Sequence, residues 1–190
     1  MYMRSNTLLT ALTLLVAFIA SACSERPPEQ FKERLIEGQA VNRSNEAVKR
    51  EDDVKEIHGL LRGMFEAVEK KDLSSLNGMI DARKGVWVDL KAEKTAAEFA
   101  ADLADPAGYV NTYYLNTEAL RRHTGESDQK ALHDLIEEST RIRADLFFQA
   151  EECEVRLTIE KPERLEAQSY RFNNAYFIKE GGRWYLYRLF

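Results

Sequence analysis

The sequence contains few of the residue types that hold small, cross-linked or metal-dependent folds together. Its 190 residues include two cysteines and three histidines. Two cysteines exclude a framework of several disulfides, so a hydrophobic core must stabilise the fold. His58, His123 and His133 lie in separate segments and lack the spacing of paired helical ligands, so the sequence predicts no metal site.

Recognisable catalytic and phosphate-binding motifs are also missing. The chain has no glycine-rich phosphate loop, no Gly-x-Ser-x-Gly nucleophile elbow and no paired cysteines with zinc-ligand spacing. Lys and Arg number 27 against 32 Asp and Glu, and no basic cluster occurs. Because binding to phosphates requires clustered positive charge, we expect no nucleic-acid partner, and we predict no cofactor.

The N-terminus carries the features of an export signal. Arg4 precedes an apolar stretch over residues 8–22, which is too short to span a bilayer comfortably. Ala20-Ser21-Ala22 supplies the small residues that a signal peptidase requires, and Cys23 follows at once. This arrangement resembles the lipobox of bacterial lipoproteins, although Ala20 stands where that family most often has Leu. Ordinary secretory cleavage and an uncleaved membrane anchor are the alternatives.

The resemblance implies that residues 1–22 are a signal peptide and that Cys23 is the lipidation site. In bacterial lipoproteins the cysteine thiol receives a diacylglyceryl group, and the new amine is acylated with a fatty acid such as palmitate. Lipid on Cys23 would hold the protein to the bacterial cell envelope, and Ser24 in place of Asp implies the outer membrane. Cys153 then has no partner, and its alternating apolar surroundings predict a buried thiol.

Residues 23–50 have the composition of a flexible tether between the lipid and a folded domain. Pro27-Pro28 stiffens its start, and residues 42–45 are polar and turn-like. Phe31, Leu35 and Ile36 could form one short helical turn. We therefore predict a single α+β domain over residues 51–190.

Apolar residues at steps of three and four predict a long amphipathic helix over about residues 53–71, and a second, shorter helix follows Asp72. Val86–Leu90 has the alternation of a strand. Thr95 and Glu98 form a capping box that opens a helix through Leu103. Further helices are predicted at residues 117–123 and after Ser127, and strands at residues 109–115, 142–148, 153–159, 170–172, 176–178 and 184–190, with Gly181-Gly182 as a hairpin turn.

Helices followed by strands predict an α+β fold, in which N-terminal helices pack on a curved antiparallel sheet. The expected core comprises Leu61, Phe65, Val68, Val88, Leu146, Val155, Leu157 and Trp184. The helix that runs into Ala67–Leu73, the strand at Val86–Leu90 and the closing hairpin with Trp184 resemble the NTF2-like family. The resemblance implies a cone-shaped sheet around a long helix, with a pocket inside the cone.

Two carboxylates are the weak catalytic candidates. Enzymes of the NTF2-like family place an acid–base carboxylate in the cone, where an apolar wall raises its pKa, so the resemblance points to Asp89. Asp145, flanked by Ala144 and Leu146, is the second candidate. The alternative is that both are solvated acids on an outer face.

Aromatic residues on the predicted strands are candidates for lining a ligand pocket. These residues are Trp87, Tyr113 and Phe147. An aromatic-rich sheet also needs such side chains for packing, so they do not by themselves define a site.

Three functions remain open from sequence. The first is a non-catalytic envelope lipoprotein whose domain binds a small apolar ligand or another envelope protein. The second is an NTF2-like isomerase, dehydratase or hydrolase that uses Asp89. The third is a structural or assembly subunit, in which an exposed aromatic sheet face forms a homodimer. Isolated carboxylates and scattered histidines favour a binding module over an enzyme.

Overall fold

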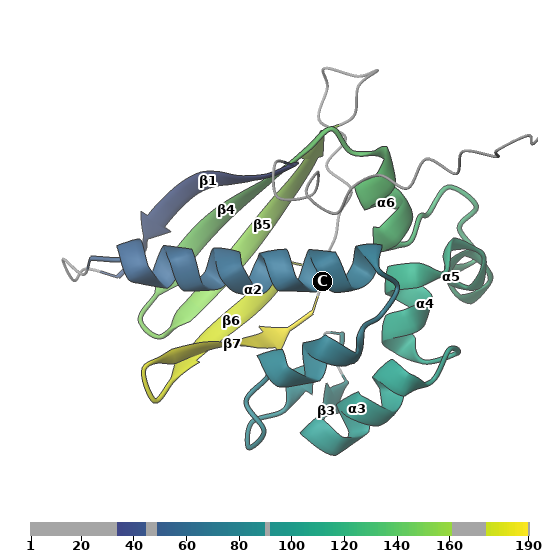
Figure 1. Ribbon diagram of the computed structural model, residues 1–190, viewed down its shortest axis with the longest axis horizontal. Coiled ribbons are helices and arrows are strands. Elements are labelled where there is room, and N and C mark those ends of the chain that lie inside the picture. The colour runs from purple at the N-terminus through teal and green to yellow at the C-terminus, as the bar shows by residue number, and fades with distance from the viewer. Residues whose placement is uncertain (1–33, 45–48, 90–91, 161–173, 190) are drawn as a thin grey trace, which may run out of the picture.

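The computed structural model describes residues 34–44, 49–89, 92–160 and 174–189, and these residues form an α+β fold (Figure 1). The strands form one seven-stranded sheet in the order β1-β4-β5-β6-β7-β2-β3. The strands are β1 (Leu35–Asn42), β2 (Val86–Trp87), β3 (Glu93–Lys94), β4 (Arg141–Gln149), β5 (Glu152–Glu160), β6 (Ala175–Glu180) and β7 (Arg183–Arg188). The helices are α2 (Glu51–Glu69), the 3₁₀ helix η1 (Ser74–Met79), α3 (Ala96–Ala104), α4 (Tyr109–Leu115), α5 (Thr117–Thr124) and α6 (Leu132–Glu138).

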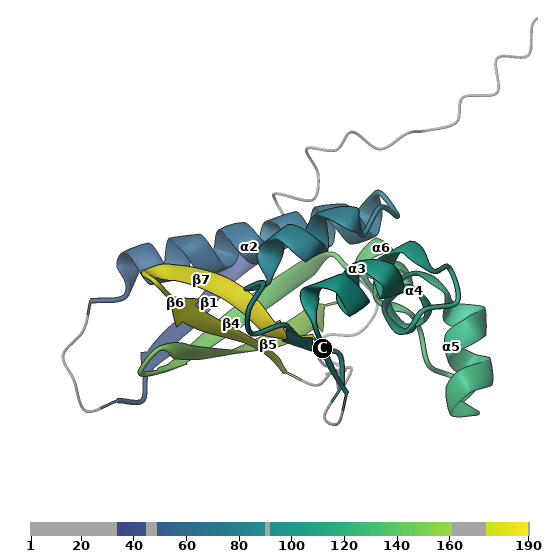
Figure 2. The ribbon, with the colours of Figure 1, turned by 90° about the horizontal axis from the view of Figure 1, so that it is seen from below.

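The long helix α2 lies along one face of the sheet, and helices α3 to α6 gather beside one end of it (Figures 1 and 2). The bounds of α2 confirm the helix that was predicted from sequence, to within two residues at each end. Ile57, Leu61, Phe65 and Val68 on its inner stripe are completely buried. A helix of this length is stabilised mainly by burial of that stripe, because propensity alone is weak.

A buried polar contact joins the first turn of α2 to the β6–β7 hairpin. The Asp53 carboxylate accepts hydrogen bonds from Lys179 Nζ at 2.6 Å, Trp184 Nε1 at 2.9 Å and Arg50 Nη1 at 2.9 Å. Glu56 accepts a hydrogen bond from the Trp184 backbone N–H at 2.9 Å. These contacts fix the position of the helix along the sheet, which apolar packing alone would leave less specific.

The sheet is mixed, which corrects the prediction of a purely antiparallel one. The pairs β4–β5, β5–β6, β6–β7 and β2–β3 are antiparallel, whereas β1 is parallel to β4 and β2 is parallel to β7. Parallel neighbours are permitted here because long helical segments separate them in sequence.

Strand β1 also corrects the predicted tether and its helical turn. Leu35 is buried opposite Ile142, and the Gln39 N–H donates to Asp145 Oδ1 at 2.9 Å beside an irregularity in the strand. The sheet therefore begins before residue 51. The pattern of residues 35–42 is weak because β1 is an edge strand whose partner lies a hundred residues later.

The segment Tyr109–Leu115, predicted as a strand, is helix α4. The Asp102 carboxylate accepts hydrogen bonds from the Tyr109 and Val110 backbone N–H groups, both at 3.0 Å, and so caps the helix from α3. Val110 and Tyr114 are buried one helical turn apart. Tertiary contacts thus override the β propensity of these aromatic and β-branched residues.

Two smaller predictions also require correction. The strand predicted at Val86–Leu90 is shorter in the structure, where β2 comprises only Val86 and Trp87. After β2, the Val88 N–H donates to the Ala92 carbonyl at 2.9 Å, and Asp89 Oδ1 accepts from the Ala92 N–H at 2.8 Å. Ser127 does not cap α6. Instead, the Ala131 N–H, which precedes the helix, donates to Thr117 Oγ1 at 2.8 Å.

The remaining core predictions are confirmed except for Leu157, which is only partly buried. The capping box of Thr95 and Glu98 is present, and Gly181 and Gly182 both have positive φ in the β6–β7 turn. Cys23, Phe31 and the predicted strand at 170–172 lie outside the described residues. No helix in the described part of the chain has the length and hydropathy to cross a membrane.

Candidate functional site

The face of the sheet away from α2 can be identified from the alternation of side chains along β6 and β7. Lys179 and Trp184 contact Asp53 and therefore point toward α2. Successive side chains of a strand point to opposite faces, so Tyr176 and Ile178 point to the other side of the sheet. This second face is the lower one in Figure 2.

A half-open hollow of about 340 Å³ lies on this second face, where β6, β7 and the segment after β2 meet. Its volume is in the range of small-molecule sites. Residue pairing explains its position, because Arg188 is the cross-strand partner of both Tyr176 and Trp87. The hollow is lined by Trp87, Asp89, Glu152, Tyr176, Ile178, Tyr187 and Arg188.

Two of the lining residues, Tyr187 and Arg188, lie together because β7 is irregular. The pairing register of β6 and β7 shifts between Tyr176 and Phe177, so that Tyr187 is an extra residue between two paired positions. Such a bulge brings consecutive side chains to one side of a strand. Tyr187 and Arg188 therefore both reach the hollow, although simple alternation along β7 would place only Tyr187 on this face.

Arg188 is the basic group of the hollow. Its guanidinium lies 3.8 Å from the centre of the Tyr176 ring, and Nη2 donates to the Asn174 carbonyl at 3.2 Å. Its Nε is buried and has no hydrogen-bond partner among the described residues. Arg188 is the one Lys or Arg among the described residues that line the hollow, so its guanidinium brings positive charge to this wall.

Asp89 lies at the side of the hollow nearest to α4. Its carboxylate accepts a hydrogen bond from the Ala92 N–H, and it acts electrostatically on Tyr109. Burial, followed by the neighbouring Tyr113 and Asp89, raises the pKa of Tyr109. Tyr109 therefore remains protonated, and it is not one of the residues that line the hollow.

Tyr113, a predicted pocket residue, lies beside the hollow and not in its wall. It stacks on Tyr109 with the ring centres 4.3 Å apart, and His123 meets its edge at 5.8 Å. The stack follows from the four-residue spacing of the two tyrosines on a helix. Its role in this arrangement is packing between α4 and α5.

Phe147 and Asp145 lie on the same face of the sheet but on β4, away from the hollow. Phe147 lies between the guanidinium groups of Arg43 and Arg156, at 4.4 and 4.6 Å from its ring centre. Asp145 accepts from the backbone of β1. Both residues therefore help to hold the edge strand.

Glu154 is the centre of the polar network around Phe147. It is buried and pairs with Arg43 at 2.8 Å and Arg156 at 2.9 Å. Burial opposes its ionisation, but these hydrogen bonds outweigh burial and lower its pKa. All of its strong contacts are internal, so we assign the network to structure.

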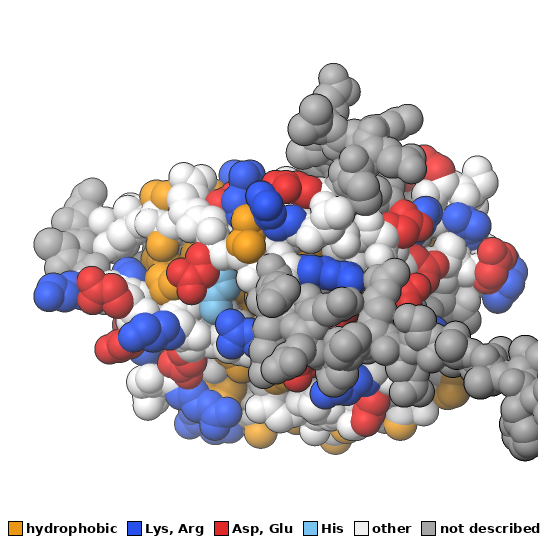
Figure 3. Space-filling model, turned by 45° about the horizontal axis from the view of Figure 1, so that its top comes forward, with side chains coloured by type: hydrophobic (Ala, Val, Ile, Leu, Met, Phe, Trp, Pro, Cys, Tyr) orange, Lys and Arg blue, Asp and Glu red, His pale blue; other side chains and the backbone are white. Residues whose placement is uncertain are grey.

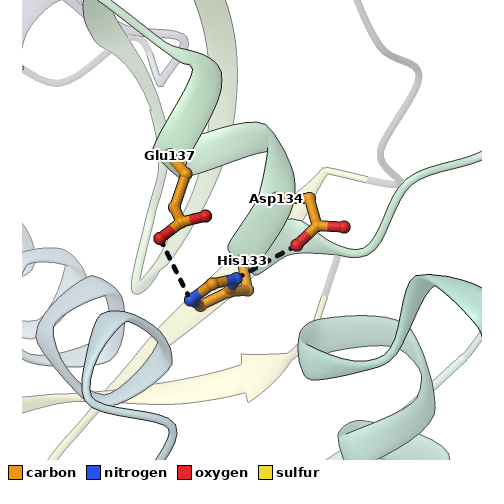
Figure 4. A group of neighbouring side chains, drawn as sticks. All are labelled: His133, Asp134 and Glu137. Atoms are coloured by element: carbon orange, nitrogen blue, oxygen red, sulfur yellow. Dashed lines mark hydrogen bonds and ion pairs between the residues drawn. The ribbon is translucent and has the colours of Figure 1, made fainter.

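A second group of titratable side chains, missed by the sequence analysis, occurs on α6. His133, Asp134 and Glu137 lie together, as Figure 4 shows. His133 is buried, its Nδ1 lies 3.1 Å from Asp134 Oδ1, and its Nε2 lies 3.8 Å from Glu137 Oε1. The four-residue spacing of His133 and Glu137 was the available sequence clue, because it places both on one side of a helix.

Cys153 is enclosed on the α2 side of the sheet. Its side chain is completely buried, and burial raises the pKa of its thiol to about 12. A nucleophilic cysteine requires the thiolate form. The prediction of a buried, unreactive thiol is thus in agreement with its surroundings.

Charge on the visible surface is mixed. In Figure 3, acidic and basic side chains are interspersed over the described residues.

Comparison with known protein families, with curated proteins and with solved structures finds no significant match to this chain. The function must therefore be argued from the sites themselves.

Proposed function

We propose that this protein is a lipid-anchored component of the bacterial envelope whose domain binds a small amphipathic ligand in the hollow beside β2. The observation that carries this proposal is the combination of an aromatic wall with the guanidinium of Arg188 in the same hollow. Trp87, Tyr176 and Tyr187 offer apolar contact, and Arg188 offers a hydrogen-bond donor. Small-ligand sites are commonly apolar with a few placed polar groups.

The chemistry of the wall selects the class of ligand. An aromatic or alicyclic body suits the aromatic wall, and one anionic group suits the positive charge of Arg188. Asp89 and Glu152 border the same hollow and disfavour a ligand with several negative charges. The proposed ligand is therefore a small apolar molecule with one carboxylate, sulfonate or similar group.

Lipid attachment at Cys23 and location at the outer membrane are also part of this proposal. They rest on the small residues before Cys23 and on Ser24 after it. We further propose that the fold is related to the NTF2-like cone, supported by the long α2 on one face of the sheet and the closing β6–β7 hairpin.

Binding can be measured with 8-anilinonaphthalene-1-sulfonate, which has an aromatic body and one sulfonate. The two tryptophans distinguish the site, since Trp87 lines the hollow and Trp184 is completely buried. We expect one probe to bind per chain and to quench Trp87 fluorescence, and Trp87→Phe to remove that quenching. Tyr187→Ala and Arg188→Gln should each weaken binding about tenfold, which corresponds to 1.4 kcal/mol.

Tyr185→Ala is the matched control, because this residue lies on β7 on the same face of the sheet but does not line the hollow. Equal loss of binding in the control and in Tyr187→Ala would contradict the assignment of the hollow. Melting curves of each variant show whether the probe binds to unfolded chain. Such binding would increase as the variants lose stability, whether or not the substituted residue lines the hollow.

A second candidate function is catalysis in the same hollow by Asp89. The observation in its favour is that this carboxylate lines the hollow and is near enough to the neutral Tyr109 phenol to act on it electrostatically. Such a pair could exchange a proton with a bound ligand. Asp89→Asn should strengthen binding of the anionic probe in either case, because it removes a negative charge from the wall of the hollow. Loss of a measured turnover in that variant would establish the enzyme.

A further inference from the structure

His133 has the orientation of a metal ligand that is held in place by a carboxylate. Its side chain is buried, and Nδ1 lies 3.1 Å from Asp134 Oδ1. The other oxygen of Asp134 accepts from Thr117 Oγ1 at 2.6 Å, which fixes the carboxylate. A proton on Nδ1 donated to Asp134 leaves the lone pair on Nε2, and metal-binding histidines are commonly supported in this way.

The second ring nitrogen has no hydrogen bond in the described part of the chain. The nearest ionic partner of Nε2 is Glu137 Oε1 at 3.8 Å. This separation is too long for a hydrogen bond. It is close to the distance of roughly 3.3 Å between two ligands of one tetrahedral zinc ion, and the Glu137 side chain is 64% exposed and free to adjust.

The surroundings supply further negative charge. Glu69, at the end of α2, is near enough to His133 and Glu137 for both to influence it electrostatically, and Glu66 adds to the same side. Arg34 faces Glu69, and Lys71 faces Asp134, so two cations partly offset the carboxylates. Glu66 also pairs with Lys70 at 3.7 Å, so the four carboxylates face three cations in all.

We propose that His133 Nε2 and Glu137 bind one divalent cation of the zinc class, with Asp134 as the positioning residue and water in the remaining places. Imidazole and carboxylate together suit Zn²⁺, which binds His nitrogen at 2.0–2.1 Å and carboxylate oxygen at about 2.0–2.2 Å. This site is separate from the hollow, since none of its residues lines that hollow. Its proof or disproof leaves the proposed ligand-binding function untouched.

The test uses the purified chain with Cys23→Ser, so that the Cys23 thiol does not bind metal. Titration with zinc chloride, followed by calorimetry, should show one ion per chain with a Kd on the order of 10 μM, because only two protein ligands are present. Glu137→Gln should weaken binding at least tenfold. Glu138→Gln is the matched control, since its parent carboxylate pairs with Lys130.

Asp134 is tested separately as a positioning residue. Asp134→Asn should weaken zinc binding by about 10- to 100-fold, and Asp134→Glu should restore part of it. Cobalt substitution supplies a readout that a purely structural role would not change. The visible absorption of bound Co²⁺ should shift in Asp134→Asn at saturating metal.

Two outcomes would overturn the metal site. The first is no binding of zinc at 100 μM, or equal binding by the parent and Glu137→Gln, which is an exposed change that should not disturb folding. The second is an NMR spectrum in which both His133 nitrogens carry protons and do not respond to zinc. That spectrum would define an imidazolium bridging Asp134 and Glu137.

Discussion

Replacement of Asp53 by Asn tests how α2 is fixed to the sheet. The carboxylate is buried and accepts from Lys179, Trp184 and Arg50. An amide of the same shape can still accept from one or two of these donors. The substitution removes the negative charge that balances Lys179 and Arg50, whose side chains are 25% and 11% exposed.

The expected cost follows from the contacts that are lost. Net contributions of hydrogen bonds to charged groups are about 1.5–3 kcal/mol, and breaking a buried ion pair costs about 3–5 kcal/mol. Lys179 keeps part of its hydration, so its contribution is reduced. We therefore expect Asp53→Asn to lower the free energy of unfolding by about 2–3 kcal/mol.

The effect should depend on pH. Burial opposes ionisation of Asp53, but the hydrogen bonds from Lys179, Trp184 and Arg50 outweigh it, so its pKa lies below the ordinary value of 3.8. A lowered folded-state pKa stabilises the protein above the unfolded-state value, and this contribution is lost as the pH falls through the folded-state pKa. The difference between parent and variant should be complete at pH 7 and should shrink below about pH 4.

Urea unfolding followed by circular dichroism measures the difference. Asp52→Asn is the matched control, because Asp52 is in the same helical turn but is fully exposed. Its ion pair with Lys55 Nζ is long at 4.0 Å and lies in solvent. Both changes alter the helix dipole interaction equally. A loss below 1 kcal/mol in Asp53→Asn, or an equal loss in the control, would refute the argument that this contact fixes α2.

Three further predictions concern the anchor, the core and the thiol. Cys23→Ser should abolish acyl labelling and release the protein into soluble fractions, and unchanged membrane partition would contradict the lipoprotein proposal. Phe65→Ala should cost roughly 3–5 kcal/mol, because this completely buried ring leaves a cavity, and a variant that melts like the parent would disprove the helix-on-sheet packing. Cys153 should resist a thiol reagent at pH 8 until urea unfolds the chain, since burial raises its pKa to about 12, and rapid labelling of the native Cys23→Ser chain would show that the thiol is accessible.

Elements that depend on near neighbours in sequence were predictable. The three- and four-residue period of α2, the capping box of Thr95 and Glu98, and the Gly181-Gly182 turn were each visible before the structure. Their physical causes are local, because they involve residues no more than a few positions apart.

The candidate sites were predictable only in part. Trp87 and Asp89 were both named as candidates on the predicted strand, Asp89 through the resemblance to the NTF2-like family, and both line the hollow. Arg188 was missed, because the bulge in β7 places its side chain on the same side of the sheet as Tyr187, against simple alternation. The sequence showed the spacing of His133 and Glu137, but not the hydrogen bond from Thr117 to Asp134 that orients the carboxylate beside the imidazole.

The sequence by itself determined the amphipathic helix, the hairpins and the α+β composition, because these follow from side-chain period and turn chemistry. Only the tertiary structure decided that Tyr109–Leu115 is a helix and that Leu35–Asn42 is a strand. Asp102 caps the first from another helix, and β4 pairs with the second from a hundred residues away. Contacts at such distances in sequence override local propensity, because they supply the hydrogen bonds that the backbone requires once it is buried.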